Sequence, residues 1–150
     1  MGSITLPNSG VIAVDANIVI YTVEKHPKYS PLLRPLWESV ETGKLVVVMS
    51  ELVLLETLVG PYRAGLSQLA ADYESFLSFT GIRLVPISPA ILRAAAEMRA
   101  KVPKLRSPDA IHAVTAIHQA ASCFLTNDLG FRNIAGFNVI LLDEALTTHP

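Results

Sequence analysis

Short runs of apolar residues alternate along this chain with longer segments in which apolar residues recur every three or four positions. A short apolar run bounded by turn residues is typical of a buried strand, and the longer spacing is typical of a helix that packs on one side. The expected strands cover residues 11–14, 45–49, 82–87, 123–126 and 139–142. The expected helices cover residues 17–23, 31–42, 51–60, 66–79, 89–101 and 108–121. This alternation predicts an α/β fold in which helices flank a central parallel sheet of about five strands.

Serine, proline and glycine residues mark the ends of the expected helices. Ser50 is a good N-cap for the third helix, which is expected to end near Gly60-Pro61. The pairs Ser88-Pro89 and Ser107-Pro108 each combine an N-cap with a proline in the first turn. The sequence contains no repeat, low-complexity tract or linker. Residues 1–150 are therefore expected to form one compact doubly wound domain, with 1–10 as a flexible lead-in.

The apolar content is high for a soluble protein. Hydrophobic residues make up 51% of the chain, and the mean hydropathy is +0.42. The longest apolar runs, such as residues 45–49, are far shorter than the roughly 20 residues needed to span a bilayer. The apolar residues are therefore assigned to a core, and neither a membrane segment nor a signal peptide is expected. Cys123 is the only cysteine, which excludes an internal disulfide and a cysteine-based zinc site and fits a reducing cytoplasm.

The distribution of charge is more informative than its total. The net charge of −1 does not suggest a nucleic-acid-binding protein. Four cations nevertheless crowd the segment just before Asp109, namely Arg99, Lys101, Lys104 and Arg106. They are either a solvated helix end, where cations suit the helix dipole, or a rim that contacts RNA phosphates beside an acidic centre.

Two carboxylates follow directly on expected strands. Asp15 ends the apolar run 11–14, and Asp128 lies just beyond the run 123–126. Ligands of an open parallel sheet bind beyond the carboxyl ends of its strands, so both side chains are expected at that edge. Each also has a structural interpretation: Asp15 as a helix N-cap, a role that Asn17 could serve equally well, and Asp128 as a turn residue.

Glu56 lies in a largely apolar stretch of the third expected helix. On that helix it shares a face with Leu52, Leu55 and Val59, and this face is expected to point inward. An ionised carboxylate buried without a partner costs several kcal/mol. Glu56 should therefore either bind a cation or pair with a neighbour, for which Arg63 is the candidate.

Asp109 stands in the first turn of the last expected helix, where the helix dipole alone would stabilise an acid. His112 lies about one turn further on and could reach the same region, but it is expected to be a packing or hydrogen-bonding histidine. His118 lies nearly on the opposite side of the helix from His112, so the two histidines cannot share one ion.

These four acids together predict a metal site. If the fold brings them together, they form a nest of negative charge that cannot stay ionised without a cation. A divalent metal is the expected compensation, and metal-assisted cleavage of a phosphodiester is the expected use. Under this hypothesis Asp15 and Asp109 hold the principal ion, while Glu56 and Asp128 bind it through water or hold a second ion.

Four motifs, taken in order, resemble those of the PIN domain family. They are Val14-Asp15-Ala16-Asn17, Ser50-Glu51 followed by Glu56, Ser107-Pro108-Asp109-Ala110-Ile111-His112-Ala113, and Leu125-Thr126-Asn127-Asp128 with Phe131. The resemblance covers essentially the whole chain and is closest to the VapC-type ribonuclease toxins of bacterial and archaeal toxin–antitoxin pairs. It implies a Rossmann-like parallel sheet and an endoribonuclease that depends on Mg²⁺ or Mn²⁺.

The resemblance also implies roles for individual residues. The catalytic and metal-binding positions of the family fall on Asp15, Glu56, Asp109 and Asp128. Asn17 and Thr126 match its polar supporting positions. Many relatives carry a further acid where this chain has Gly130, and this departure removes a carboxylate from a second metal site.

The partners implied by the resemblance are an RNA substrate, a second copy of the chain in a homodimer, and a small antitoxin that covers the acidic groove. Several apolar residues exceed what one small sheet needs in its helical coat, so they are candidates for an interface, with a well-filled core as the alternative. They are Leu32, Leu33, Leu36, Trp37, Leu54, Leu58, Tyr62, Leu66 and Leu69.

Other function classes fit less well. A phosphatase of the haloacid dehalogenase type needs a second Asp where this chain has Asn17, and a two-component receiver needs an acidic pair after the first strand. A housekeeping PIN nuclease that is not a toxin would look similar at the site. A non-catalytic module that binds RNA or protein on the same fold usually loses acids that this chain keeps.

Overall fold

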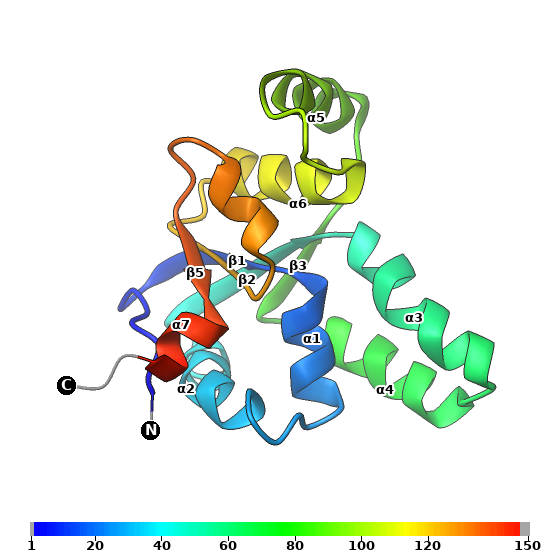
Figure 1. The fold of residues 1–150 in the computed structure, drawn as a ribbon. Helices are drawn as coiled ribbons and strands as arrows, with labels where there is room; N and C mark the ends of the chain where they lie inside the picture. Colours follow the sequence, from blue (N-terminus) through cyan, green and yellow to red (C-terminus); the bar gives the residue numbers. More distant parts are fainter. Residues whose placement is uncertain (1, 148–150) are drawn as a thin grey trace.

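The computed structural model of the protein describes residues 2–147. One sheet is formed by β1 (Gly10–Val14), β2 (Leu45–Ser50), β3 (Ile82–Val85), β4 (Phe124–Thr126) and β5 (Val139–Leu141). The strand order is β3-β2-β1-β4-β5, and every neighbouring pair is parallel (Figure 1). The chain builds outward from β1 to β3 and then builds outward on the other side of β1, which is a doubly wound topology. The predicted α/β fold with five parallel strands is confirmed.

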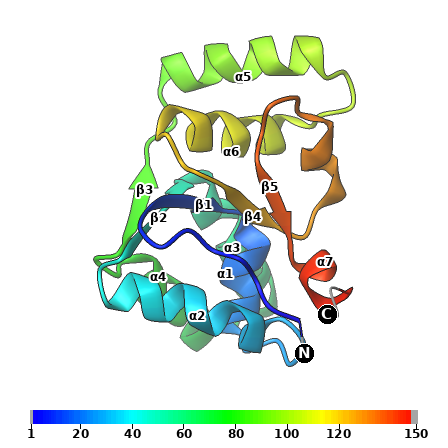
Figure 2. The same cartoon turned by 90° about the vertical axis from the view of Figure 1, so that its left-hand side faces the viewer.

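Helices cover both faces of the sheet (Figure 2). One face packs against α1 (Ala16–Val23), α2 (Ser30–Glu41), α3 (Leu52–Ala64) and α4 (Ser67–Leu77). The other face packs against α6 (Ser107–His118), on which α5 (Pro89–Lys101) lies. The 3-10 helix η1 (Leu129–Asn133) is on this second side, and α7 (Leu142–Thr147) follows β5.

Both faces of the central strands are buried, which explains their continuous apolar sequences. Along β1, Ile12 and Val14 face the core under α1–α4, while Ala13 faces the core under α6. Along β2, Met49 faces the first core and Val48 the second. In the register of the sheet Ala13 lies opposite Val48 on β2 and opposite Phe124 on β4. The carboxyl ends of β1 and β4 are thus held side by side.

Helix α3 is longer than predicted, because it does not end at Gly60-Pro61. Pro61 lies inside the helix and is buried, so its packing offsets the backbone hydrogen bond that a proline cannot donate. The helix ends at Gly65, whose φ of +68° is a left-handed conformation favoured by glycine. There Leu66 N donates to Pro61 O at 2.9 Å.

Two of the three predicted serine N-caps are displaced. Ser88 caps α5 as predicted, by accepting a hydrogen bond from Ile91 N at 3.2 Å. Ser50 is instead the last residue of β2, although its hydroxyl accepts from Leu52 N at 3.2 Å. Ser107 is the first residue of α6, and Arg106 holds the cap position without a capping side-chain bond.

The two short helices after β4 are not predicted from the sequence pattern. η1 begins after Asp128, and α7 begins directly after β5, at residue 142, which the sequence pattern predicts as part of the strand. Both are too short for a periodic apolar pattern to reveal them. Within residues 2–147, no helix combines the length and the apolar character needed to cross a bilayer.

Candidate active site

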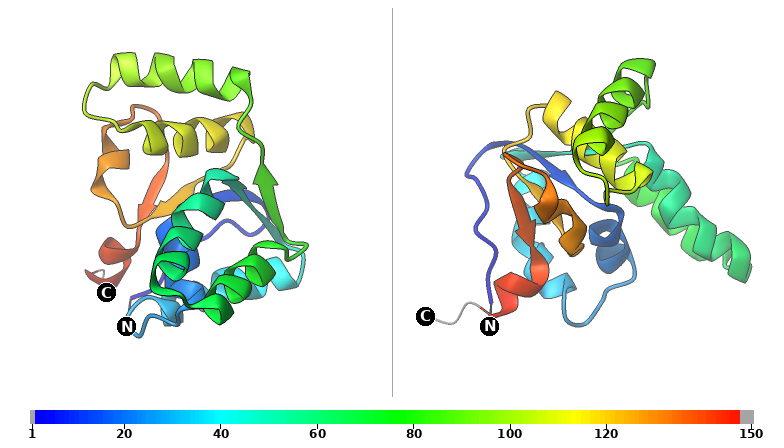
Figure 3. Two further views of the ribbon diagram at one scale, coloured as in Figure 1. Left: turned by 90° about the vertical axis from the view of Figure 1, so that its right-hand side faces the viewer. Right: turned by 45° about the horizontal axis from the view of Figure 1, so that its top comes forward.

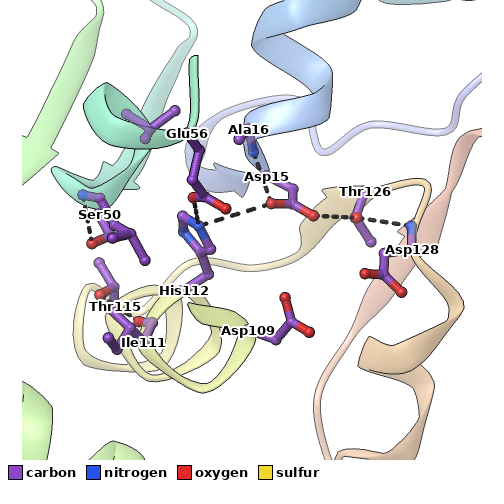
Figure 4. Close-up of polar contacts among 12 residues, drawn as sticks. Asp15, Ala16, Ser50, Glu56, Asp109, Ile111, His112, Thr115, Thr126 and Asp128 are labelled. Carbon is purple, nitrogen blue, oxygen red and sulfur yellow. Dashed lines mark hydrogen bonds and ion pairs between the residues drawn. The ribbon is translucent and has the colours of Figure 1, made fainter. Parts of the chain in front are cut away.

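The four predicted acids lie at the carboxyl edge of the sheet and on the helices beside it (Figure 4). Asp15 directly follows β1, and Asp128 comes two residues after β4. Glu56 comes from α3, and Asp109 comes from the first turn of α6. The site thus takes one acid from each of four segments that are separated along the chain.

Asp15 is buried and anchored at both carboxylate oxygens. Its Oδ1 accepts a hydrogen bond from Ala16 N at 2.8 Å, so Asp15 is also the N-cap of α1. Its Oδ2 accepts from the hydroxyl of Thr126 at 2.7 Å. Burial raises the pKa of Asp15, although His112, Thr126 and Ala16 oppose this shift, and the charge of Glu56 adds to it. The interpretation of Asp15 as a helix N-cap is therefore confirmed, and its role as a metal ligand stays a prediction.

Thr126 connects two of the acids. Its side chain is fully buried, donates to Asp15 and accepts a hydrogen bond from Asp128 N at 3.0 Å. Asp128 in turn accepts from Gly130 N at 2.8 Å through Oδ1 and caps η1, as the turn interpretation predicted. Its second oxygen, Oδ2, remains directed toward the acidic site, where it meets Arg106.

Glu56 is held by a histidine rather than by an arginine. His112 Nε2, from α6, is hydrogen-bonded to Glu56 Oε1, and it lies 3.9 Å from Asp15 Oδ1. Burial lowers the pKa of His112, but the hydrogen bond and charge of Glu56, with the charges of Asp15 and Asp109, outweigh it, so the net shift is upward. The predicted hydrogen-bonding histidine is confirmed, and Arg63 forms no ion pair with Glu56 among the described residues.

The predicted orientation of α3 was wrong. Leu55 and Val59, which share the face of Glu56, are 68% and 46% exposed. The buried residues of α3 are Val53, Thr57, Leu58 and Pro61. The helix rests on the core with that other face, so Glu56 reaches the site from the helix margin, with a side chain 29% exposed.

Arg106 joins the two remaining acids. Its Nε donates to Asp109 Oδ2 at 3.1 Å, and its Nη2 lies 3.4 Å from Asp109 Oδ1 and 3.5 Å from Asp128 Oδ2. The side chain of Asp109 is only 10% exposed, whereas that of Arg106 is 70% exposed. An exposed cation therefore lies over a buried carboxylate.

The other members of the predicted basic rim have different environments. Arg99 donates to Leu105 O at 2.9 Å and to Ser107 Oγ at 2.8 Å, so it links the end of α5 to the start of α6. Lys101 and Lys104 are exposed. Of the four cations, Arg106 is the one that the structure places at the acids.

The four carboxylates contact two basic side chains, Arg106 and His112, and are not arranged around one point. In residues 2–147 no three His, Cys, Asp or Glu side chains are arranged as a ready-made metal site. The donors nevertheless suit a hard cation: all four acids offer oxygen, and Oδ1 of Asn17 is buried without a hydrogen-bond partner. Asp15 is buried with a raised pKa, a penalty that a bound cation would relieve. The residues present therefore fit a divalent metal.

Few of the apolar residues suggested as an interface are exposed. Leu32, Leu33, Leu36 and Leu58 belong to the core, on which Trp37, Leu54 and Leu69 pack as partly buried residues. Tyr62 and Leu66 are 65% and 51% exposed. With Leu55 and Val59 they form an apolar surface on α3 and at the start of α4, two helices that lie side by side (Figure 3).

A comparison with protein families identifies the fold. The PIN domain family model matches residues 12–137. The chain belongs to the PIN domain family. Among curated proteins, none matches this sequence.

Solved structures of similar fold include several VapBC proteins. VapBC2 from Rickettsia felis, bound to a DNA fragment from its promoter, gives a TM-score of 0.69 at 20% identity, over 87% of this chain and 98% of that one. DNA-bound VapBC from Salmonella typhimurium gives a TM-score of 0.68 at 18% identity, over 91% of this chain and 99% of that one. VapBC-1 from nontypeable Haemophilus influenzae gives a TM-score of 0.64 at 19% identity, over 89% of this chain and 98% of that one. At these identities the likeness establishes the fold of this PIN domain.

The pairing of this PIN domain's acids with Arg106 and His112 is not predicted from the sequence pattern. Arg106, Asp109 and His112 follow one another at intervals of three residues, which places them along one side of the start of α6. That spacing was the available signal for the contact between Arg106 and Asp109. The contact between His112 and Glu56 joins residues 56 positions apart, and no local pattern reports it.

Proposed function

We propose that this PIN domain is a metal-dependent endoribonuclease and the toxin of a VapBC-type toxin–antitoxin pair. Family membership supports hydrolysis of a nucleic acid. The observation that carries the proposal is the position of Asp15 and Asp109, two buried carboxylates that flank the carboxyl edge of the sheet with Glu56 and Asp128 beside them. A soluble domain does not retain several acids in one place without a ligand or internal cations to compensate them.

The metal would be Mg²⁺ or Mn²⁺, held by Asp15 and Asp109, with Glu56 and Asp128 as further or water-mediated ligands and Asn17 as a neutral oxygen donor. Such an ion, when bound, makes a water molecule more acidic and stabilises the negative charge that develops at phosphorus. Oxygen donors and carboxylates are what both ions prefer.

The chain's own residues would prepare the site for this chemistry. Thr126 fixes one oxygen of Asp15 and the backbone of Asp128, so both acids keep their orientation. His112 holds Glu56 toward Asp15. Polar groups of this kind, which contact metal ligands, determine how the ligands are aimed. The exposed cations Lys101, Lys104 and Arg106 are the proposed contacts to RNA phosphates, together with Arg99, whose two hydrogen bonds within the fold make it the weakest candidate.

The proposed partners follow from the similar structures and from the exposed apolar surface. The compared structures are VapBC complexes, two of them bound to DNA. We propose a cognate antitoxin and a homodimer for this chain too, with the apolar surface of α3 and α4 as one area of contact. An RNA substrate and the single buried cysteine fit a cytoplasmic protein.

The proposal is tested by incubating total cellular RNA with the wild type and with Asp15→Asn, in Mg²⁺, in Mn²⁺ and in EDTA. Discrete fragments should appear with the wild type only when a metal is present. Asp15→Asn should lose at least about a hundred-fold of the cleavage rate, because it removes the charge of a proposed metal ligand. Asp72→Asn makes the same chemical change on the exposed side of α4 and should cleave like the wild type.

Each alternative predicts a different result. Cleavage that survives in Asp15→Asn or in EDTA would exclude the metal-dependent mechanism. Metal-independent RNA binding without cleavage would favour a non-catalytic module. A housekeeping PIN nuclease would be favoured by a third result: the chain cleaves RNA, but its expression does not slow growth and it captures no product of an adjacent gene.

A further inference from the structure

Arg106 contacts two acids of the site, although most of its side chain is in solvent. We propose that Arg106 is an internal counter-ion, which occupies Asp109 and Asp128 until a divalent cation displaces it and then binds a phosphate of the substrate. This inference rests on the proposed function, because it takes the same acids to be the metal ligands.

The contacts of Arg106 are suited to displacement. The Nε bond to Asp109 is 3.1 Å, but the two Nη2 contacts, at 3.4 and 3.5 Å, are at the long limit for a hydrogen bond. The guanidinium is exposed, so water screens its attraction to the acids and the ion pairs contribute little to stability. A divalent cation has twice the charge and binds the carboxylate oxygens directly. We therefore expect a divalent cation to displace Arg106 from the carboxylates.

The backbone at Arg106 does not need to move for this exchange. Arg106 is the N-cap residue of α6, with φ −77° and ψ 157°, between the buried Leu105 and the first turn that contains Pro108. Ala110 N donates to Arg106 O at 3.0 Å, which anchors the peptide to the helix. The long side chain can therefore turn away from the acids while this peptide stays in place.

The guanidinium group is also suited to the second role. It is planar, permanently charged and able to give two parallel hydrogen bonds to a phosphate, as it does to a carboxylate. Its side chain already reaches the space between Asp109 and Asp128, where a phosphodiester must approach a metal held by these acids. A displaced Arg106 would therefore remain next to the substrate.

His112 is the other basic side chain among the acids, and it is not interchangeable with Arg106. The His112 side chain is 1% exposed and is enclosed between Glu56 and Asp15, so it has no solvent position to which it could turn. Only Arg106 is therefore proposed to exchange with the metal.

The test measures Mn²⁺ binding by electron paramagnetic resonance in the wild type, in Arg106→Gln and in Arg106→Lys. Removing the competing cation should tighten Mn²⁺ binding about two- to five-fold in Arg106→Gln. Arg106→Lys keeps the charge but loses the forked geometry of the guanidinium. Its affinity for Mn²⁺ should lie between those of the wild type and Arg106→Gln. Arg93→Gln is the matched control, since it removes an exposed arginine from α5 and should leave Mn²⁺ binding unchanged.

A second readout follows the guanidinium directly. The Nε–H resonance of Arg106, identified by its loss in Arg106→Gln, should be protected from solvent exchange without metal, and Mg²⁺ should shift it and remove the protection. In steady-state cleavage with Mg²⁺, Arg106→Gln should raise KM for RNA about two- to five-fold, and Arg93→Gln should not. Circular dichroism confirms that each variant is folded.

The outcomes separate this inference from the nuclease proposal. Equal Mn²⁺ affinity in the wild type and Arg106→Gln, or an Nε–H resonance that Mg²⁺ leaves in place, would overturn the role of Arg106 and leave the nuclease standing. An unchanged KM would overturn its contact with phosphate. A wild type that binds no Mn²⁺ would overturn both the inference and the metal-dependent function.

Discussion

The hydroxyl of Thr126 donates a hydrogen bond of 2.7 Å to Asp15 Oδ2, and the two residues are 111 positions apart in the sequence. They meet because β1 and β4 are adjacent parallel strands that end at the same edge, with Val14 in register with Leu125. The same hydroxyl accepts from Asp128 N. One buried side chain therefore sets the positions of two proposed metal ligands.

Thr126→Val tests this arrangement, because it keeps the volume of the side chain and removes only the hydroxyl. We expect metal affinity and cleavage to fall about 10- to 100-fold, as is usual when a group that orients a metal ligand is lost. Isothermal titration with Mn²⁺ gives the affinity. Thr115→Val is the control: Thr115 is as deeply buried, but its hydroxyl bonds to Ile111 O within α6 and not to an acid. Equal losses in the two variants would show that the effect is only structural.

The metal-free protein should become less stable as the pH rises. The pKa of His112 is raised above its unfolded value of 6.5, so its pairing with Glu56 is fully stabilising below that pH and is lost as the pH rises through the folded value. The pKa of Asp15 is raised above 3.8, so ionising it in the fold also costs stability as the pH rises. Both His112 and Asp15 therefore lower the stability of the metal-free protein as the pH rises.

Urea unfolding in EDTA at about pH 5.5 and about pH 8 measures this dependence. The unfolding free energy of the wild type should be lower at the higher pH. That of His112→Gln should fall by less, because this variant lacks one of the two titrating groups. Saturating Mg²⁺ should restore stability at the higher pH, since it binds only the folded site. A steeper pH dependence in His112→Gln than in the wild type would contradict the assignment.

Gly60, within α3, and Gly65, at its C-cap, should respond to alanine in opposite ways. Gly60 is exposed within the helix and has no heavy atom within 4 Å of an added Cβ, so Gly60→Ala should stabilise the protein by about 0.5–1 kcal/mol. Gly65 has the same open surroundings but a φ of +68°, so Gly65→Ala should destabilise it by about 1 kcal/mol. Urea denaturation of both variants gives the comparison. Equal effects would argue against the position of the helix end.

The exposed apolar surface of α3 should matter for assembly and not for folding. The double variant Leu55→Ser/Tyr62→Ser should unfold within about 0.5 kcal/mol of the wild type, since both side chains are mostly in solvent. It should weaken self-association or antitoxin binding, measured by analytical ultracentrifugation and by pull-down with the adjacent gene product. Leu92→Ser, on the exposed side of α5, is the control and should change neither. Loss of assembly in the control would remove the case for a specific surface.

The sequence by itself determined the sheet and the identities of the acids. Strand positions were readable because strands buried on both faces appear as uninterrupted apolar runs, and Asp15 and Asp128 were readable because each stands just beyond such a run. Asp109 and Glu56 were identified as candidates by their positions in the expected helices, and the resemblance to PIN domains supported this choice. These features depend on neighbours in the chain, which is why a local pattern was sufficient.

Only the tertiary structure decided what surrounds the acids. It turned α3 so that Leu55 and Val59 face solvent, because the face of a helix that packs depends on what it rests on and not on its most apolar stripe. It also brought His112 to Glu56 and Arg106 to Asp128, contacts that join separate segments of the chain. The balance of charge in the site follows from those contacts, and no local pattern in the sequence contains them.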